Sequence, residues 1–475
     1  MSDSSKSMLQ KATLPAGWML APIAQLATFN PKTDAHEQQH CGFAPMQGLG
    51  TRYLDKLAFE IRPWGEVRKS YTHFRDGDVL VAKVTPCFEN GKAGIARDLP
   101  NGIGAGSSEF CVFRPAEGID ERYLLAWLSS EDFRRRATVS MTGSVGLKRV
   151  PKDFFLSEQI PLAPSAEQRR IADKLDTVLT RVDTVNTRLT RVAPILKRFR
   201  QSVLAAATSG RLTEDWRLSV TVQNAADDLQ RNLELRAKSE KKVPAAPDMT
   251  HWKKVIPPTW AVASVHQFAE CLDRLRVPIK RDARKSELML YPYYGANGEV
   301  GRIDEYIFDD ELVLVTEDET FYGREKPIAY RSSGKCWVNN HAHVLRAPSK
   351  EANDYLCYSL MYYDVIPWLS GTTGRAKLTQ QALNALPIAV PPAQEIAEIV
   401  RCVKTLFAFA ERLEARLQAA RTAANRLTPA LLAKAFRGEL VPQDPNDEPA
   451  AELLKRLAAS APATTKRRGR PAKAA

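Results

Sequence analysis

An internal repeat without gaps constrains this chain more than any other feature of its sequence. Segment 163–212 aligns with segment 391–440 at a constant offset of 228 residues. Identical residues at matching positions include Pro164 and Pro392, Glu167 and Glu395, and Gly210 and Gly438. Weaker matches precede each segment, among them Trp18 with Trp260, Tyr123 with Tyr355, and Thr142-Gly143 with Thr373-Gly374. The sequence therefore predicts two half-molecules, each a mixed domain followed by a long helix.

Each repeated segment carries apolar residues at alternating spacings of four and three. The first stripe is Ile171, Leu175, Val178, Val182, Val185, Leu189, Val192, Leu196, Phe199 and Val203. The second is Ile399, Val403, Leu406, Ala410, Leu413, Leu417, Ala420, Ala424, Leu427 and Leu431. A heptad this regular is typical of a coiled coil. A helix over about 166–208 would span ~60 Å.

The helix ends and their interruptions are also predicted. Pro164 and Pro392 precede the helices, and Gly210 and Gly438 follow them, where a left-handed cap is favoured. Pro194 and Pro429 fall inside, where each should kink or interrupt its helix. The simplest partner for one stripe is the other stripe of the same chain. The alternatives are that each helix packs on its own domain or pairs between two chains.

Charge and cysteine content narrow the class of protein. The 475 residues carry a net charge of +13, which favours a polyanionic partner such as nucleic acid, although a merely basic protein would look the same. The seven cysteines form no CxxC pair, which argues against a disulfide framework or a zinc ribbon and favours a reducing cytoplasm. We find no signal peptide and no apolar run that could span a membrane, so we expect a cytoplasmic protein without a membrane partner.

Known catalytic motifs are missing from the sequence. It contains no P-loop, no GxSxG and no Asn/Asp-Pro-Pro-aromatic tetrapeptide. An HExxH string occurs at 36–40, but its flanks, Asn30-Pro31 and Cys41-Gly42, show no helical periodicity, so we interpret it as a polar loop rather than a zinc site. We expect no catalytic, cofactor-binding or metal-binding residue in this chain.

Two further groups contain residue types that bind metal ions. His341 and His343 would share one face of a strand, but only Cys336 is near, so we interpret them as polar side chains on a DNA-facing or solvent-facing surface. The acidic run 317–319 could hold a metal, and we interpret it as a solvated turn.

The remaining candidate chemistry is DNA binding. Arginine and lysine neutralise phosphates or contact guanine, and asparagine can read adenine. Small basic loops recur at 142–149 and 371–377, where glycine would permit close approach to a phosphate backbone; ordinary surface loops are the alternative. The predicted DNA-binding residues are Arg68, Lys69, Lys83, Lys92, Ser107, Ser108, Gly143, Ser144, Lys148, Arg149, Arg302, Asn339, Asn340, His341, Thr373, Gly374, Arg375 and Lys377.

The basic C-terminal tail contains a short motif. Arg468-Gly469-Arg470-Pro471, preceded by Lys466-Arg467, is similar to an AT-hook that enters the minor groove. A solvated tail explains it equally well.

Several motifs together resemble the specificity subunits of type I restriction–modification enzymes. They cover nearly the whole chain apart from its two ends. The motif at the start of the first helix fits the family pattern Pro-x-x-Glu-Gln fully, whereas the second helix has Ile396 in place of the glutamine. The others include Gly65-Glu66-Val67-Arg68-Lys69, Asp76-Gly77-Asp78-Val79-Leu80, Lys83-Val84-Thr85-Pro86, Gly106-Ser107-Ser108-Glu109-Phe110, Tyr294-Gly295-Ala296-Asn297-Gly298, Trp337-Val338-Asn339-Asn340-His341 and Val441-Pro442-Gln443-Asp444-Pro445.

The resemblance implies an α+β chain in which two mixed α/β target-recognition domains are separated by two long antiparallel coiled-coil helices. Each domain would read one half of a bipartite, asymmetric target in double-stranded DNA. The partners would be two modification subunits, which use S-adenosylmethionine to methylate adenine, and restriction subunits that translocate with ATP and Mg. The chain itself would bind no cofactor.

The predicted segments follow from the repeat and the resemblance together. They are a disordered N-terminus at 1–12, recognition domain 1 at 13–163, long helix 1 at 164–212, a connector at 213–250, recognition domain 2 at 251–390, long helix 2 at 391–440 and a C-terminal segment with a basic tail at 441–475.

Two other functions remain as alternatives. A self-contained methyltransferase or nuclease with unrecognised motifs would methylate or cut DNA as an isolated chain. A coiled-coil scaffold that binds only protein would lack salt-dependent DNA binding.

Overall fold

The structure is a computed structural model, and it describes residues 14–144, 146–221, 223–237, 243–279, 288–318, 321–371 and 376–460. The predicted AT-hook lies outside these residues. The chain divides into two compact units: unit 1 is Met1–Thr190 with Gln418–Ala475, and unit 2 is Arg191–Leu417. Each unit therefore contains one mixed domain and a part of both long helices. Among the described residues, no helix is long and apolar enough to cross a membrane.

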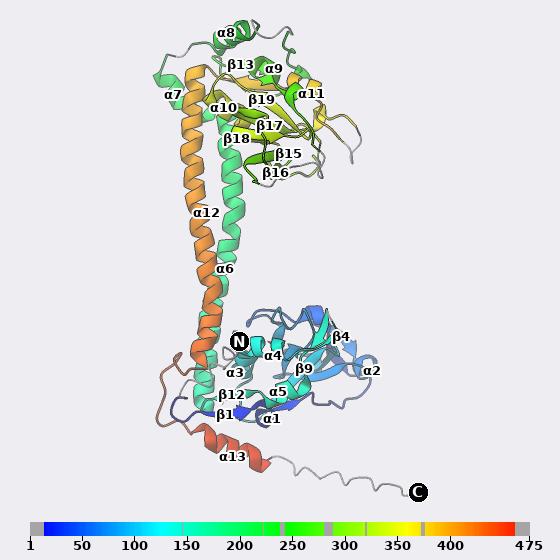
Figure 1. Ribbon diagram of the computed structural model, residues 1–475. Helices are drawn as coiled ribbons and strands as arrows, with labels where there is room; N and C mark the ends of the chain where they lie inside the picture. The colour runs from blue at the N-terminus through cyan, green and yellow to red at the C-terminus, as the bar shows by residue number, and fades with distance from the viewer. Residues whose placement is uncertain are drawn as a thin grey trace, which may run out of the picture. The chain divides into compact units, whose positions relative to one another are not determined.

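The mixed domain of unit 1 is built on two four-stranded sheets, ordered β2-β9-β6-β7 and β4-β3-β8-β5 (Figure 1). Two antiparallel pairs, β1 with β12 and β10 with β11, complete it. Its strands are β1 Met19–Pro22, β2 Ala27–Phe29, β3 His40–Ala44, β4 Glu60–Pro63, β5 Thr72–Arg75, β6 Val79–Ala82, β7 Ala93–Ile95, β8 Ile103–Gly106, β9 Phe110–Pro115, β10 Thr142–Ser144, β11 Leu147–Arg149 and β12 Gln159–Leu162.

Short helices cover these sheets. Helix α3 begins after Asp120, whose carboxylate accepts from the backbone N–H groups of Arg122 and Tyr123, and every residue from Tyr123 to Leu128 is buried. The helices of unit 1 outside the long pair are α1 Ile23–Leu26, α2 Trp64–Val67, α3 Glu121–Leu128, α4 Glu131–Val139, α5 Lys152–Ser157 and α13 Ala450–Ser460, with short 3-10 turns η2 Met46–Gly48 and η3 Pro100–Gly102.

The mixed domain of unit 2 has a different plan. One sheet of six strands, ordered β14-β19-β17-β18-β15-β16, forms its centre, and β13 pairs with β20. Four consecutive buried apolar residues, Leu312 to Val315, place β17 in the interior. The strands are β13 Ala261–Ser264, β14 Glu270–Cys271, β15 Tyr291–Gly295, β16 Gly298–Ile303, β17 Phe308–Thr316, β18 Ala329–Val338, β19 Ala342–Arg346 and β20 Pro387–Val390.

Helices and turns surround this sheet. Helix α10 packs against β17 and β18, with Tyr355, Leu356 and Leu360 fully buried. The described helices of unit 2 outside the long pair are α7 Glu214–Ser219, α8 Ala225–Ala237, α9 Val265–Phe268, α10 Lys350–Leu360 and α11 Gln380–Ala385, and the 3-10 turns are η4 Arg211–Thr213, η5 Met249–His251, η6 Asp273–Leu275 and η8 Ile366–Trp368.

The two long helices are α6, Ser165–Thr208, and α12, Ala393–Ala435. Both run without interruption through their internal prolines, Pro194 and Pro429, so of the predicted kink or interruption at these residues the interruption is wrong. The predicted caps are confirmed, because Gly210 and Gly438 have φ angles of 79° and 71°. The predicted α+β architecture with two long helices is also confirmed.

The long helices pair with each other in opposite directions within each unit (Figure 1). In unit 1 the first turns of α6, with Leu175 and Leu179, share a core with Leu432 near the end of α12. In unit 2 the last turns of α6, with Val203, share a core with Ile399 and Val403 near the start of α12. The stripes are unevenly covered, since Val185 and Leu427 are 46% and 47% exposed.

A repeated module joins each mixed domain to its long helix. The indole of Trp18 donates to Glu167, and the indole of Trp260 donates to Glu395. The β1–β12 register pairs Met19 with Leu162, and the β13–β20 register pairs Ala261 with Val390, which is Leu162 plus the repeat offset. Ile396, which stands in place of the glutamine of the Pro-x-x-Glu-Gln motif in the second helix, is buried in the apolar core of unit 2.

Candidate nucleic-acid interface

In unit 1 the predicted basic loop is an exposed β-hairpin formed by β10 and β11. Gly143 pairs with Lys148 and Thr142 with Arg149. Gly143 has a φ of 129°, and a Cβ at that position would lie 2.7 Å from the carbonyl oxygen of Leu147. Glycine is therefore required for this hairpin to close.

The base of the hairpin is held by the segment 83–85 that follows β6. The backbone N–H of Lys148 donates to Thr85 Oγ1 over 2.9 Å, and the backbone N–H of Thr85 donates to the Lys148 carbonyl over 3.0 Å. Two residues further along the chain, the backbone N–H of Val150 donates to the Lys83 carbonyl. These bonds fix where the Lys148 side chain leaves the surface.

The charged groups of two predicted residues, Lys83 and Arg149, meet at Glu109 beside this hairpin. Arg149 makes a bidentate pair with Glu109, at 3.0 Å from Nε to Oε2 and 2.7 Å from Nη2 to Oε1. Lys83 Nζ donates to the carbonyl of Ser108 over 2.9 Å and lies 4.0 Å from Glu109. The hydrogen bond from Arg149 holds the pKa of Glu109 below its usual value. Part of the positive charge is thus already balanced within the domain.

The other residues predicted in this domain have varied positions. Ser107 lies beside the cluster, with its Oγ accepting from the Glu109 N–H. Ser144 is exposed on the hairpin. Arg68 and Lys69 are exposed after α2, where Arg68 pairs with Glu37 at 2.5 Å.

The geometry of Lys92 argues against its predicted contact with DNA. Its Nζ donates to the carbonyl oxygens of Met46 and Leu49 over 2.8 and 2.9 Å. The ammonium group therefore fixes the 46–49 turn within the domain.

In unit 2 the described ends of the second predicted loop are joined to each other. Ser370 and Lys377 exchange backbone hydrogen bonds of 2.9 and 2.8 Å. Lys377 is exposed, and its Nζ lies 3.4 Å from Asp318. Thr373, Gly374 and Arg375 lie outside the described residues.

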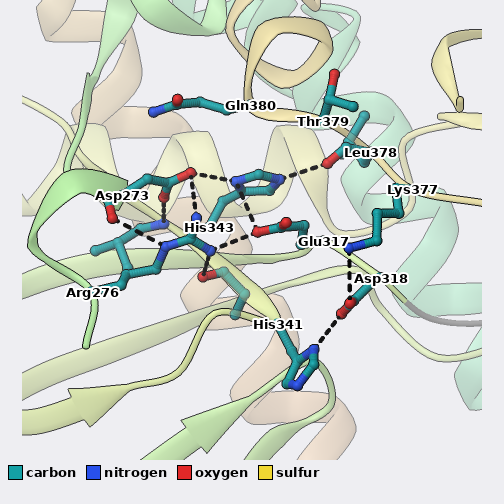
Figure 2. A network of polar contacts seen from close by, with 12 residues as sticks. Asp273, Arg276, Glu317, Asp318, His341, His343, Lys377, Leu378, Thr379 and Gln380 are labelled. Carbon is teal, nitrogen blue, oxygen red and sulfur yellow. Dashed lines mark hydrogen bonds and ion pairs between the residues drawn. The ribbon is translucent and has the colours of Figure 1, made fainter. Parts of the chain in front are cut away.

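Asp318 also contacts a second predicted residue. His341 is exposed, and its Nδ1 lies 2.7 Å from Asp318 Oδ1 (Figure 2). Asn339 is buried and accepts the backbone N–H of His341 through Oδ1, whereas Asn340 is exposed. Asn339 therefore shapes the turn that places His341 on the surface beside Lys377.

Arg302 lies apart from this group. It is exposed on β16, where its guanidinium donates to the Leu290 carbonyl over 3.1 Å and lies 3.8 Å from Glu299. Among the described residues, no hydrogen bond or ion pair joins it to Asp318, His341 or Lys377.

His343 corrects one prediction. Its side chain is 1% exposed, so it lies in the interior rather than on a surface shared with His341, which precedes β19. Nδ1 is 2.6 Å from Asp273 Oδ2 and Nε2 is 2.7 Å from the Leu378 carbonyl oxygen (Figure 2). The two histidines therefore lie in different environments although they are only two residues apart in the sequence.

Ligand-type atoms of Asp273, Glu317 and His343 lie within 4.8 Å of one another, as in a metal site. However, the guanidinium of Arg276 contacts both carboxylates, at 2.6 Å from Glu317 and 3.2 Å from Asp273. Burial favours the protonated acid, but the bond from His343 and the charges of His343 and Arg276 hold the pKa of Asp273 below its usual value. A cation of the chain itself, the Arg276 guanidinium, therefore already pairs with both carboxylates.

Sequence reasoning missed several residues of these clusters. Thr85 and Glu109 lie in the quoted motifs, but nothing in their spacing indicates that they bind the distant hairpin. Asp318 was interpreted as part of a solvated turn, and its contacts with His341 and Lys377 give it a more specific place. The HExxH segment contains a turn at 37–38 and no helix, as predicted, although its last residue, His40, begins β3 rather than lying in the loop.

Comparison with known proteins agrees with this architecture. The family model described as type I restriction modification DNA specificity domain matches residues 15–193 and 257–420, which is more than half of the chain. The EcoAI specificity subunit of Escherichia coli is 35% identical over 248 residues, which cover 50% of this chain but only 42% of that protein. The EcoEI specificity subunit of E. coli is 36% identical over 209 residues, which cover 43% of this chain but only 35% of that protein. The EcoKI specificity subunit of E. coli strain K12 is 26% identical over 94% of this chain and 96% of its own.

Solved structures share the fold. The HsdS subunit from Thermoanaerobacter tengcongensis aligns with a TM-score of 0.56 at 18% identity, over 90% of this chain and 99% of that chain. A chain from a structural study of complex assembly and conformational transition of the type I R-M system aligns with a TM-score of 0.62 at 16% identity, with the same coverage. The sequence match and the fold together show that this chain belongs to the family of type I restriction modification DNA specificity domain proteins.

Proposed function

We propose that this chain is the DNA specificity subunit of a type I restriction–modification complex and reads a bipartite, asymmetric target in double-stranded DNA. The observation that carries the proposal is the repeated Trp–Glu module, which attaches two unlike mixed domains to equivalent points on two long helices. Each domain also presents a basic element at matching places of the repeat, the Thr142–Arg149 hairpin and the Ser370–Lys377 loop base.

The difference between the domains supports two unlike half-sites. Domain 1 uses two four-stranded sheets, whereas domain 2 uses one of six strands. Because sequence is read by side chains on a particular surface, two different frameworks present different sets of contacts to DNA. The long helices would then set the non-specific spacer between the half-sites.

Lysines and arginines of the two basic elements would act mainly on phosphates. Lys148 and Lys377 are exposed, and the backbone from which each side chain extends is fixed by hydrogen bonds. Such contacts position a protein on the duplex without reading bases. Arg149 would exchange some of its contact with Glu109 for a phosphate.

The chemical steps belong to partner subunits. The geometry of this chain offers binding contacts, and in the one metal-like cluster among its described residues Arg276 already pairs with both carboxylates. Two modification subunits with S-adenosylmethionine would methylate adenine, and restriction subunits with ATP and Mg would cleave. The repeated helices would offer two similar docking faces, one for each modification subunit.

Two measurements test the proposal. Methylome sequencing of cells that carry the system should show one bipartite methylated motif, which disappears when only this chain is deleted and returns on complementation. Mass measurement of the co-purified complex should give two modification subunits per chain. A motif that persists without the chain, or methylation by the isolated chain, would contradict the assignment.

A further inference from the structure

Two buried histidines of this chain differ in the groups that face their rings. His73 in domain 1 accepts the Thr33 N–H at Nδ1 over 3.2 Å and has the Arg68 carbonyl 2.8 Å from Nε2. One donor and one acceptor suit a neutral imidazole. His343 in domain 2 instead faces two acceptors, a carboxylate oxygen of Asp273 and the carbonyl oxygen of Leu378. The pKa of Asp273 is held below its usual value, and with this carboxyl ionised both contacts can be hydrogen bonds only when both ring nitrogens carry a proton.

The surrounding charges fit a protonated His343. The groups that face it are Asp273 and Arg276 at η6 and Glu317 after β17, with His343 Nδ1 3.8 Å from Glu317 Oε2. Two carboxylates, one guanidinium and one imidazolium give a neutral quartet, and buried charges are stable only when paired in this way. The backbone N–H of Val344 donates to the other oxygen of Asp273 over 2.8 Å.

This quartet holds the base of the second basic loop. Leu378 is bound on both sides: its carbonyl accepts from His343, and its N–H donates to the Glu317 carbonyl over 2.9 Å. The preceding residue is Lys377, whose backbone pairs with Ser370 and whose side chain reaches Asp318 beside His341 (Figure 2). The imidazole is thus one residue away from the exposed cation of the loop.

We propose that His343 and Asp273 are positioning residues for DNA binding by domain 2. The imidazolium fixes the Leu378 carbonyl and so sets the place from which Lys377 reaches a DNA phosphate. This role rests on the proposed DNA-binding function and adds the residues that act through Lys377.

The charge balance predicts an unusual pattern among amide substitutions. His343→Gln leaves the buried group with a net negative charge and turns an amide oxygen toward one of the two acceptors. Asp273→Asn leaves an excess positive charge. The double variant is neutral: the new amide at 343 donates to Leu378 and accepts from the amide at 273, whose oxygen still accepts the Val344 N–H. Its cost is the contact between Arg276 and the former Asp273 Oδ2, while Arg276 keeps Glu317. The double variant should therefore be closer to the wild type than either single variant.

The experiment uses the full chain in its complex with the modification subunits, and it has two readouts. Hydrogen exchange without DNA reports on backbone N–H groups at 376–380. The affinity for duplex DNA that carries the target motif without methylation is measured across a salt series. His343→Gln should speed exchange at Leu378, weaken binding about fivefold to tenfold and reduce the log–log salt slope by about one, and Lys377→Ala should have the same effect on binding and slope. The double variant should restore all three values.

His73→Gln is the matched control, because an amide can keep both hydrogen bonds of the neutral His73 ring. It should leave exchange at 376–380, affinity and salt slope unchanged. Should His343→Gln fail to fold, the comparison of Asp273→Asn with the double variant gives the same test.

The outcomes separate this role from the proposed function. Unchanged exchange at Leu378, faster exchange with unchanged affinity and slope, or a double variant no better than the singles would each overturn the positioning role. A wild-type complex without sequence-specific binding would overturn the proposed function and this role with it. The exchange data would then show only whether His343 holds the backbone at Leu378.

Discussion

Trp260 donates its indole N–H to Glu395 Oε2 over 2.9 Å, and Trp18 donates to Glu167 Oε2 over the same distance. The two carboxylates differ in their other oxygen. Glu395 Oε1 accepts from Thr213 Oγ1 and Arg217 Nη2, both at 2.7 Å. Glu167 Oε1 is buried without a hydrogen-bond partner among the described residues. Burial accordingly raises the pKa of Glu167.

This difference predicts unequal effects of one substitution. Glu395→Gln leaves the charge of Arg217 uncompensated in a largely buried site and should reduce the free energy of unfolding of unit 2 by about 3 kcal/mol. Glu167→Gln keeps the acceptor for Trp18 and should change stability of unit 1 by less than about 1 kcal/mol. Chemical denaturation of the two variants checks the order. Equal losses would show that Arg217 and Thr213 add nothing.

The long helices should be sensitive at their covered ends and tolerant where they are exposed. Leu175 is fully buried in the core of unit 1, so Leu175→Ala should cost about 2–5 kcal/mol. Val185 belongs to the same stripe but is 46% exposed, so Val185→Ala should change stability by less than about 0.5 kcal/mol. Thermal unfolding of both variants makes the comparison. A large loss at Val185 would mean that the stripe is buried along its whole length.

The domain 1 hairpin should show a graded response to removal of its cations. Lys148→Ala should weaken DNA binding by roughly 1 kcal/mol for all sequences and reduce the salt slope by about one. Arg149→Ala should do less, because Glu109 already balances much of its charge. Filter binding across a salt series on target and unrelated duplexes measures both effects. A loss confined to one base position would instead indicate direct readout.

His73 makes the stability of domain 1 depend on pH. Burial lowers the pKa of its imidazole below the usual value. Above about pH 6.5 the ring is neutral in both states, and as the pH falls the unfolded chain takes up the proton first, so stability decreases. His73→Gln should remove this contribution while it leaves stability near pH 7 almost unchanged. Urea denaturation at pH 7.5 and about pH 5.5 tests it; identical pH dependence in both proteins would exclude His73 as the source.

Much of the architecture could be predicted because it is encoded by repetition and periodicity. The repeat matched Trp18 with Trp260 and Glu167 with Glu395, although it did not indicate that each tryptophan binds its glutamate, and the caps at Gly210 and Gly438 followed from residue type. The apolar stripes identified the faces that meet. They did not predict that Val185 is exposed, since periodicity gives the direction of a side chain and not what covers it.

The polar clusters were less predictable, for a physical reason. Asp273 and His343 are 70 residues apart, Arg149 and Glu109 are 40 apart, and Arg217 and Glu395 are 178 apart. Such pairs depend on how strands and loops come together, and no local pattern encodes them. The same limit explains why His341 and His343, alike in sequence spacing, have separate partners.

The central claim is that each mixed domain reads its own half-site, and a domain exchange tests it most directly. Segment 13–163 would be replaced by the equivalent domain of a related specificity subunit, with the Glu167 partner tryptophan kept so that the helix start is preserved. The methylated motif of cells carrying the chimera is then sequenced. The account predicts that one half of the motif changes and that the other half and the spacer stay the same. A chimera that assembles with its modification subunits but changes both halves together, or loses the half-site of the untouched second domain, would contradict it.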